Sequence, residues 1–267
     1  MFRSTFCRTT LCALAIAIFV QPAAGQAPAA KPGVFAGHSH AVSAVGFAPN
    51  GKILATGSFD FSLKLWDVAT SRELRTLAGH THQVLALDIS RDGTLLASGS
   101  RDNTVRLWDM IVPDPVAVLA GHAGEVESLA LNGDGSLIAS ASLDRTVKIW
   151  QRADGKLLRT LEGHAAELTR VAVRKDNQQI ASADRSGTIR LWNLADGTPQ
   201  GEVNSPGGSL TGLAFHPNNQ SLLTASEDGT LRYWQLPVTP RQAAELPAEL
   251  TSVALSADGK LMITGSA

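Results

Sequence analysis

The amino-acid sequence predicts an all-β fold made of one four-stranded unit that is repeated along the chain. Three observations support this prediction. The five tryptophans recur every 42 residues, and Gly-His pairs recur with the same period from Gly37 to Gly163. Short turn signals, such as Asn50-Gly51 and Asp92-Gly93, keep step with both. Self-similarity at a fixed period of roughly 20 to 50 residues is typical of architectures in which each unit stacks on its neighbours.

The composition agrees with many short strands in a folded domain. The chain has 267 residues, of which 44% are hydrophobic, and its net charge is −1. Frequent glycine together with Val, Leu, Ile, Ser and Thr favours strands joined by tight turns. A near-neutral chain lacks the basic field of a nucleic-acid binder, so no nucleic-acid partner is expected.

The first 25 residues are typical of a secretory signal peptide. Arg3 and Arg8 precede the apolar run 11–20, and the small residues Ala23 and Gly25 follow it. The run is short for a membrane span, although an uncleaved anchor is the alternative. We therefore predict a signal peptide over 1–25, a linker over 26–32 and no membrane span after cleavage.

This segment also bears on localisation. Both cysteines, Cys7 and Cys12, lie within it, so the mature chain would contain no thiol and no disulfide. We expect an exported protein that is periplasmic or secreted.

Each repeated unit divides into four predicted strands. The first is apolar at alternate positions, as at Val45 and Phe47, and ends in a turn whose glycine supplies the positive φ of a tight hairpin. The second covers 53–58, the third alternates as at Leu63 and Leu65, and the fourth covers 73–77. The predicted domain, 33–267, contains units at about 37–78, 79–120, 121–162, 163–204 and 205–246, and a partial one at 247–267.

These units resemble WD40 repeats, the family found in G-protein β subunits. In the second unit, Gly79 precedes His80, Asp102 follows 22 residues after this histidine, and Trp108 comes six residues later. The resemblance covers residues 33 to 266. It implies a WD40 β-propeller with five full four-stranded blades and a partial sixth, and thus an incomplete ring.

The partial sixth unit leaves closure of the ring unexplained. Val34 to Ala36 is a candidate for the outer strand that closes a propeller, but the sixth unit, from Leu250, stops before its third strand. An unpaired strand edge promotes association. Two alternatives are open: a truncated product of a longer propeller protein, or an arc completed by another chain in an edge-paired oligomer.

The resemblance also implies a hydrogen-bonded tetrad of His, Ser or Thr, Asp and Trp in each blade. A closed network satisfies the buried indole N–H and the buried carboxylate, which is a structural role. A catalytic Ser-His-Asp triad is the rejected alternative, because a nucleophile site would not recur at one offset in every unit. The predicted tetrad residues are His38, Thr56, Asp60 and Trp66; His80, Ser98, Asp102 and Trp108; His122, Ser140, Asp144 and Trp150; His164, Ser182 and Trp192; and Thr224, Asp228 and Trp234.

The last two tetrads depart from the pattern. In the fourth unit Ser186 stands where Asp is expected, and Asp184 lies two positions earlier. In the fifth unit Pro206 replaces the histidine. We therefore expect blades four and five to be locally less stable than blades one to three.

In the second unit, two nearby serines could supply the tetrad hydroxyl, and we assign Ser98 rather than Ser100 to the tetrad.

In this family the partner-binding face is lined by the residue before the turn Asp and by positions three and five after the His. A mixture of apolar and charged side chains suits a protein or peptide partner, and four glutamates suggest a basic one. An ordinary solvated rim is the alternative. The candidate face residues are Phe59, Gln83, Leu85, Arg101, Glu125, Glu127, Leu143, Glu167, Thr169, Arg185 and Glu227.

A basic residue also recurs two positions before each tryptophan. We interpret its stem as a cover for apolar surface, with the charged head in solvent or on a carboxylate, rather than as a phosphate-binding ring. These residues are Lys64, Arg106, Lys148, Arg190 and Arg232.

The sequence thus predicts a non-catalytic scaffold that binds proteins or peptides, without a cofactor or a metal. The pair His38-Ser39-His40 offers too few ligands for a metal site. The alternatives are an exported propeller enzyme, such as a quinoprotein dehydrogenase or a lactonase, and a propeller module of a larger exported enzyme or envelope assembly whose catalytic part lies outside this chain.

Overall fold

The computed structural model describes residues 33–110, 115–237, 239–245, 250–256 and 262–266, and its regular elements are all β-strands. Blade one consists of β1 (Val42–Phe47), β2 (Ile53–Ser58), β3 (Leu63–Asp67) and β4 (Glu73–Leu77). Blade two consists of β5 (Val84–Ile89), β6 (Leu95–Ser100), β7 (Thr104–Asp109) and β8 (Pro115–Ala120). Blade three consists of β9 (Val126–Leu131), β10 (Leu137–Ser142), β11 (Val147–Gln151) and β12 (Leu157–Leu161).

The fourth and fifth blades repeat this arrangement. Blade four consists of β13 (Leu168–Val173), β14 (Gln179–Asp184), β15 (Thr188–Asn193) and β16 (Pro199–Asn204). Blade five consists of β17 (Leu210–Phe215), β18 (Ser221–Ser226), β19 (Thr230–Gln235) and β20 (Thr239–Glu245). The strands β21 (Leu250–Leu255) and β22 (Met262–Ser266) form a separate two-stranded sheet. The predicted signal peptide and linker lie outside the described residues.

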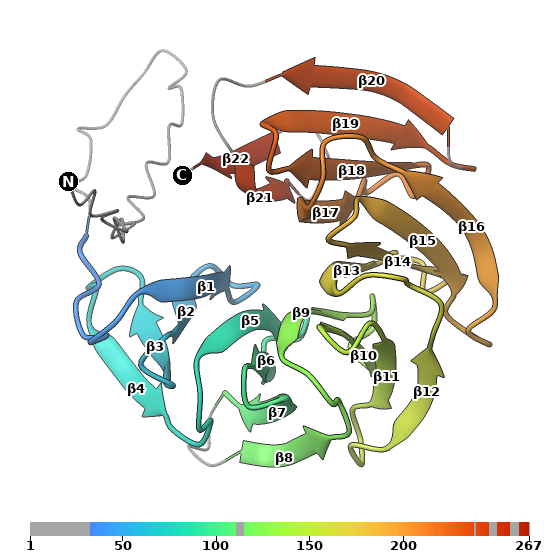
Figure 1. Ribbon diagram of the computed structural model, residues 1–267. Coiled ribbons are helices and arrows are strands. Elements are labelled where there is room, and N and C mark those ends of the chain that lie inside the picture. Colours follow the sequence, from blue (N-terminus) through green and yellow to red (C-terminus); the bar gives the residue numbers. More distant parts are fainter. Residues whose placement is uncertain (1–32, 111–114, 238, 246–249, 257–261, 267) are drawn as a thin grey trace, which may run out of the picture.

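Each blade is an antiparallel sheet whose four strands follow in sequence order. Figure 1 shows the sheets arranged around a central axis, with the first strand of each blade innermost and the fourth outermost. The first strands of successive blades lie against each other, from β1 and β5 to β17 and β21. The all-β repeat fold predicted from the sequence is confirmed.

The turns between the first and second strands adopt the predicted conformation. Gly51, Gly93 and Gly135 have φ angles of 66°, 70° and 72°, and Asn177 and Asn219 have 61° and 59°. These left-handed values are the ones that glycine and asparagine tolerate best, so the turn signals in the sequence determine where each hairpin reverses.

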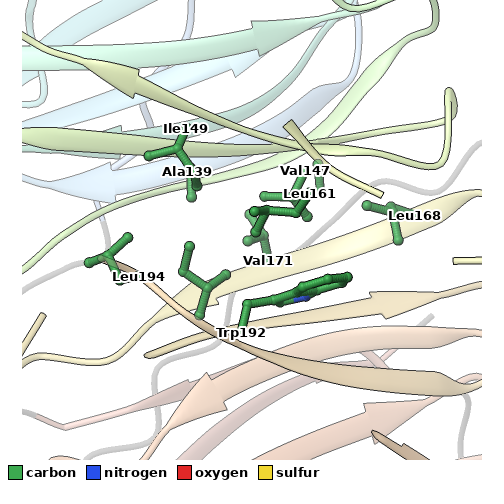
Figure 2. Packing of buried hydrophobic residues seen from close by; sticks show 10 residues of the cluster. Ala139, Val147, Ile149, Leu161, Leu168, Val171, Trp192 and Leu194 are labelled. Atoms are coloured by element: carbon green, nitrogen blue, oxygen red, sulfur yellow. The ribbon is translucent and has the colours of Figure 1, made fainter. Parts of the chain in front are cut away.

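The hydrophobic core is divided into clusters, each formed between two successive blades. Between blades three and four, Val147 and Ile149 pack with Leu168 and Trp192, which are buried (Figure 2). Equivalent clusters join blades one and two, two and three, and four and five. The cluster between blade five and β21 contains only Ala225, Leu231 and Leu250 as buried members among the described residues. Each blade is therefore stabilised mainly by its neighbours in the series, as in other repeat proteins.

The two ends of the series differ from the five complete blades between them. Residues 33–38 form no strand, and the Phe35 ring instead packs edge-on against Trp66 of blade one, with ring centroids 5.8 Å apart. The expected outer strand at Val34 to Ala36 is therefore not formed. On β1, Val45 and Phe47 are 44% and 54% exposed, because no described sheet covers this face. The incomplete ring remains a prediction.

Candidate functional site

Blade two shows the geometry of a complete tetrad. Trp108 Nε1 donates a hydrogen bond to Ser98 Oγ at 2.8 Å. Ser98 Oγ and His80 Nε2 lie 2.7 Å apart, and His80 Nδ1 lies 2.7 Å from Asp102 Oδ2. Because the serine oxygen accepts from the indole, its own hydrogen is free to bond to Nε2, and Nδ1–H then donates to the carboxylate. Burial lowers the pKa of His80, which favours this neutral imidazole.

Blades one and three repeat this geometry with the predicted residues. Thr56 Oγ1 in blade one lies 2.7 Å from His38 Nε2 and accepts from Trp66 Nε1 at 2.8 Å. In blade three Ser140 Oγ makes the same two contacts, with His122 and Trp150. In blade two the neighbouring Ser100 does not join the tetrad; it donates to the carbonyl of His82 and accepts from the Asp102 N–H.

Each tetrad aspartate is also held by a hydroxyl residue that the sequence analysis missed. In blade three, Thr146 donates to Asp144 Oδ1 through both its N–H and its hydroxyl, at 2.9 and 2.7 Å. Burial raises the pKa of Asp144, but the bonds from His122 and Thr146 lower it more, so its pKa lies well below the usual range. The signal was available: a Ser or Thr follows each tetrad Asp by two residues. These residues are Ser62, Thr104, Thr146, Ser186 and Thr230.

The tetrad of blade four is complete, contrary to the sequence pattern. Asp184 Oδ2 lies 2.7 Å from His164 Nδ1, while Ser182 Oγ contacts His164 Nε2 and accepts from Trp192 Nε1. Ser186, at the position expected for aspartate, donates its hydroxyl to Asp184 Oδ1 at 2.6 Å. The aspartate has moved by two residues and the network is preserved, so the reason to expect a weaker blade four is removed.

Blade five lacks the histidine, and an arginine contacts its aspartate instead. Trp234 Nε1 still donates to Thr224 Oγ1, at 3.0 Å. Arg232 Nη2 lies 3.3 Å from Asp228 Oδ2, the oxygen that faces the histidine in the other blades. Gly207, after Pro206, packs so closely that a Cβ on it would lie 1.8 Å from Asp228 Oδ2. Glycine and arginine therefore fill the space that the imidazole occupies elsewhere.

Most of the basic residues that recur two positions before each tryptophan form ion pairs with carboxylates or hydrogen bonds with hydroxyls. Lys64 Nζ is 2.8 Å from Glu73 Oε2, and Arg190 Nη2 is 2.7 Å from Glu202 Oε2. Lys148 is buried and donates to Thr160 Oγ1 at 3.0 Å. These contacts match the interpretation of a covering role.

The structure brings together the two residue sets of the candidate face. In blades one to three the residue before the turn Asp donates its backbone N–H to the carbonyl of the third residue after the His, and the equivalent positions of blades four and five are bonded in the same way. The five pairs therefore lie at one end of the sheets, where each second strand ends and each first strand begins. The pairs are Phe59 with Ala41, Arg101 with Gln83, Leu143 with Glu125, Arg185 with Glu167, and Glu227 with Ser209.

Side-chain contacts connect this face across blades. The Arg101 guanidinium of blade two lies 5.9 Å from the centroid of the Phe59 ring in blade one. Arg101 Nε also lies 3.0 Å from Glu125 Oε2 in blade three. Within blade four, Arg185 Nη1 and Glu167 Oε2 form an ion pair. Glu125 and Glu167 are thus already paired with arginines, which weakens the inference that they select a basic partner.

Two predicted face residues lie deeper than the others. Thr169 is buried, and its hydroxyl donates to the carbonyl of Leu210 in blade five at 2.7 Å. Glu127 is half-buried, and burial raises its pKa, opposed by the positive charge of Arg170. The sequence analysis missed Arg170, whose Nε donates to the carbonyl of Thr211 in blade five at 2.6 Å. Thr169 and Arg170 therefore join blade four to blade five rather than line the exposed face.

Within the described ranges, no helix meets the length and hydropathy needed to cross a bilayer.

The sequence pattern of the WD domain, G-beta repeat, called WD40, matches the chain five times. The matches cover residues 30–67, 71–109, 113–151, 155–193 and 197–235. They are offset from the blades: the match over 71–109 contains β4 of blade one and β5, β6 and β7 of blade two. Each of the four matches after the first therefore supplies the outer strand of one blade and three strands of the next.

Several fungal proteins share a short stretch with this chain. The protein named "Probable E3 ubiquitin ligase complex SCF subunit sconB" is 52% identical over 44 residues in Talaromyces stipitatus and in Aspergillus oryzae. The Arthroderma benhamiae protein of the same name is 48% identical over 44 residues. The stretch is 16% of this chain and 6% of each relative, so the chain matches only a small part of their length.

These relatives overturn one prediction from the sequence. They are fungal subunits of an E3 ubiquitin ligase complex, not periplasmic or secreted proteins. The prediction of an exported, periplasmic or secreted protein is therefore wrong. A positive and apolar N-terminal segment suggested it, and that segment lies outside the described residues.

Proposed function

Because the chain belongs to the WD40 family of WD domain, G-beta repeat proteins, we propose that it is a non-catalytic scaffold that binds a protein or peptide partner on the face around Phe59, Arg101 and Leu143. The sconB relatives, named as subunits of a multi-protein complex, support a role in protein association.

One observation carries the proposal: an exposed aromatic ring, an arginine and a glutamate form one contact chain over three blades. Phe59 is 37% exposed, and the side chains of Arg101 and Glu125 are 43% and 34% exposed. An aromatic ring under an arginine is a combination enriched at protein interfaces. The half-buried Leu143 lies at the equivalent turn of blade three and adds apolar area.

The tetrads support a structural role rather than catalysis. Ser98, Ser140 and Ser182 are 0% exposed, and each oxygen already accepts a bond from an indole N–H. A nucleophile has to meet its substrate, and these hydroxyls are enclosed by the packing of two blades. The same Ser-His-Asp contacts are thus used to fix each turn to its sheet.

A peptide array tests the proposed face. The labelled chain is applied to an array of random dodecapeptides, and the bound set is remeasured with Phe59→Ala, Arg101→Ala and Leu143→Ala. We expect each variant to lower the affinity for the selected peptides at least about tenfold, since residues of this kind carry most interface energy. Leu74→Ala is the matched control, because Leu74 is an exposed leucine (54%) on the outer strand β4.

The array result contradicts the proposal if the three face variants bind the same peptides with unchanged affinity. Thermal unfolding of each variant shows that the fold is retained. If only Leu74→Ala lost binding, the result would indicate that peptides bind to the outer strands and not to the proposed face.

A further inference from the structure

Blade two contains a cation that lacks the partner found in the other blades. Among the basic residues two positions before each tryptophan, four contact an oxygen of their own blade: Lys64 with Glu73, Lys148 with Thr160, Arg190 with Glu202, and Arg232 with Asp228. Arg106 is the exception within the described residues: it is half-buried, and its Nε is enclosed without an acceptor. Its terminal nitrogens Nη1 and Nη2 are not enclosed, so a ligand can reach them from solvent.

The strand register explains why Arg106 has no partner. Residues directly opposite each other in an antiparallel pair lie on the same face of the sheet. Opposite the basic residue, the fourth strand has Thr76 in blade one, Thr160 in blade three and Glu202 in blade four, and each of these oxygens contacts the cation. In blade two Val118 of β8 stands opposite Arg106. Valine cannot accept a hydrogen bond, so the fourth strand offers this cation nothing at that position.

The guanidinium of Arg106 nevertheless lies where that of Arg190 lies in blade four. A Cβ on Gly79 would lie 2.8 Å from Arg106 Nη1, and a Cβ on Gly163 would meet Arg190 Nη1 in the same way. Both glycines directly precede the tetrad histidine of their blade. In blade four the guanidinium at this place holds Glu202, with Nη2 2.7 Å from Oε2. Blade two therefore has the cationic half of this ion pair and lacks the carboxylate.

The strand beside this cation exposes apolar side chains. Val116 and Val118 of β8 are 62% and 47% exposed. Figure 1 shows β8 at the outer rim, and its outer edge pairs with no described strand. The fourth strands of the other four blades each contain at least one charged residue, whereas β8 contains none. Charged side chains commonly protect such edges from association, so β8 lacks this protection.

The other blades also indicate which group fits the cation. The basic residue contacts a carboxylate in blades one, four and five and a hydroxyl in blade three. A guanidinium and a carboxylate can form two parallel hydrogen bonds, which are stronger than bonds between neutral groups. A partly buried charge without a counter-charge is costly, so a carboxylate that arrives from outside would be stabilised beside Arg106.

We propose that Arg106, Val116 and Val118 form a surface that binds a partner protein segment in which a glutamate or aspartate is flanked by apolar residues. The carboxylate accepts hydrogen bonds from Arg106 Nη1 and Nη2, as Glu202 does from Arg190 in blade four. The apolar neighbours of the acidic residue pack on the two exposed valines. This surface shares no residue with the proposed face, so either one can fail without the other.

The test is a titration of the ¹⁵N-labelled full chain with the peptide Ac-Val-Ala-Glu-Ala-Val-NH₂. Its valines lie two residues from the glutamate, because side chains two apart share one side of an extended segment. We expect a saturable shift of the Arg106 Nε–H signal and of the backbone amides of Val116 and Val118. The same peptide with glutamine in place of glutamate, and the peptide Ac-Ala-Ala-Glu-Ala-Ala-NH₂, should each bind at least about tenfold more weakly.

Two variants remove the site in different ways. Arg106→Gln removes the cation, and Val118→Glu supplies the missing carboxylate from the chain itself, as Glu202 does in blade four. Each should weaken binding of the first peptide at least about tenfold. Arg190→Gln is the matched control, because it makes the same change in a blade whose cation is already paired, and it should leave the titration unchanged. Thermal unfolding of the three variants verifies their fold.

Several results would overturn the proposal. These are the absence of a saturable shift at Arg106, equal binding of the glutamine peptide, and unchanged binding to a folded Val118→Glu variant. The peptide with phosphoserine in place of glutamate is the last comparison. If it bound at least about tenfold more tightly than the glutamate peptide, the surface would be a phosphate site and not the proposed one.

Discussion

Blades three and five contain the same tryptophan–hydroxyl bond but differ in what holds the aspartate. In blade three His122 and Thr146 both contact Asp144, whose side chain is 10% exposed. In blade five Arg232 and Thr230 contact Asp228, whose side chain is 32% exposed. The aspartate of blade three is thus held in a closed, dry network, whereas that of blade five has an open and more solvated one. Both blades thus share the bond from the indole N–H to the hydroxyl, and we expect the different contacts of the aspartate to give the two blades different stabilities.

The largest expected difference is the cost of removing the aspartate. We expect Asp144→Ala to lower the free energy of unfolding by about 3 kcal/mol, since it leaves His122 Nδ1 and the N–H groups of Ala123 and Thr146 without their acceptor. Asp228→Ala should cost about 1 kcal/mol, because its partners are more exposed. Urea unfolding measures both. Equal losses would contradict a difference between the two networks.

Acid should reveal the same difference. The bonds from His122 and Thr146 outweigh the opposing effect of burial and place the pKa of Asp144 below its unfolded value of about 3.9. Its contribution to stability is therefore fully present above pH 4 and is lost as the pH falls from there towards the folded pKa. Urea unfolding at pH 5 and pH 3 should show a smaller drop for Asp144→Asn than for the wild type. Asp228→Asn should change the drop less, and the reverse order would refute this explanation.

Local stability should follow the networks along the chain. We expect amides in β9 to β11 and in β13 to β15 to exchange at least about tenfold more slowly than those in β17 to β19, a difference of about 1.4 kcal/mol. Native-state hydrogen exchange measures this ratio. Blade four is the critical case, because its sequence departs from the repeat while its tetrad is complete; exchange as fast as in blade five would show that the contacts of Asp184 do not stabilise it.

The smallest effect is expected for the arginine that takes the place of the histidine. Arg232→Met should cost about 0.5 kcal/mol, as is usual for a partly exposed ion pair. The substitution should also raise the pKa of Asp228. In the wild type, burial raises this pKa, but the bonds from Thr230 and Arg232 lower it more, so that it lies below its usual value. Carboxyl NMR titration measures this pKa. Lys148→Met is the control, since Lys148 contacts Thr160 rather than the tetrad aspartate, and it should leave the pKa of Asp144 unchanged.

The sequence was sufficient for the strands and turns because each depends on short-range signals that recur. The glycine or asparagine of each first turn and the alternation around each tryptophan determine where the hairpins begin and end. The same repetition identified the tetrads, since residues at one offset occupy equivalent places in successive sheets.

The departures were not predictable, because they depend on packing between units. In blade four the repeat spacing predicts an aspartate at the position of Ser186. The carboxylate of Asp184, two residues earlier, reaches His164 equally well. Thr169 was assigned to the exposed face by its offset, yet a hydrogen bond to the next blade buries it.

The offset between sequence repeats and sheets has an evolutionary consequence. Since the match over 71–109 ends one sheet and begins the next, its removal as a unit would leave β8 to complete the sheet begun by β1. Unequal recombination between repeats would therefore lengthen or shorten the array by whole sheets without leaving any of them incomplete. Gene rearrangement of this kind could alter the diameter of the assembly while the contacts between adjacent units stayed the same.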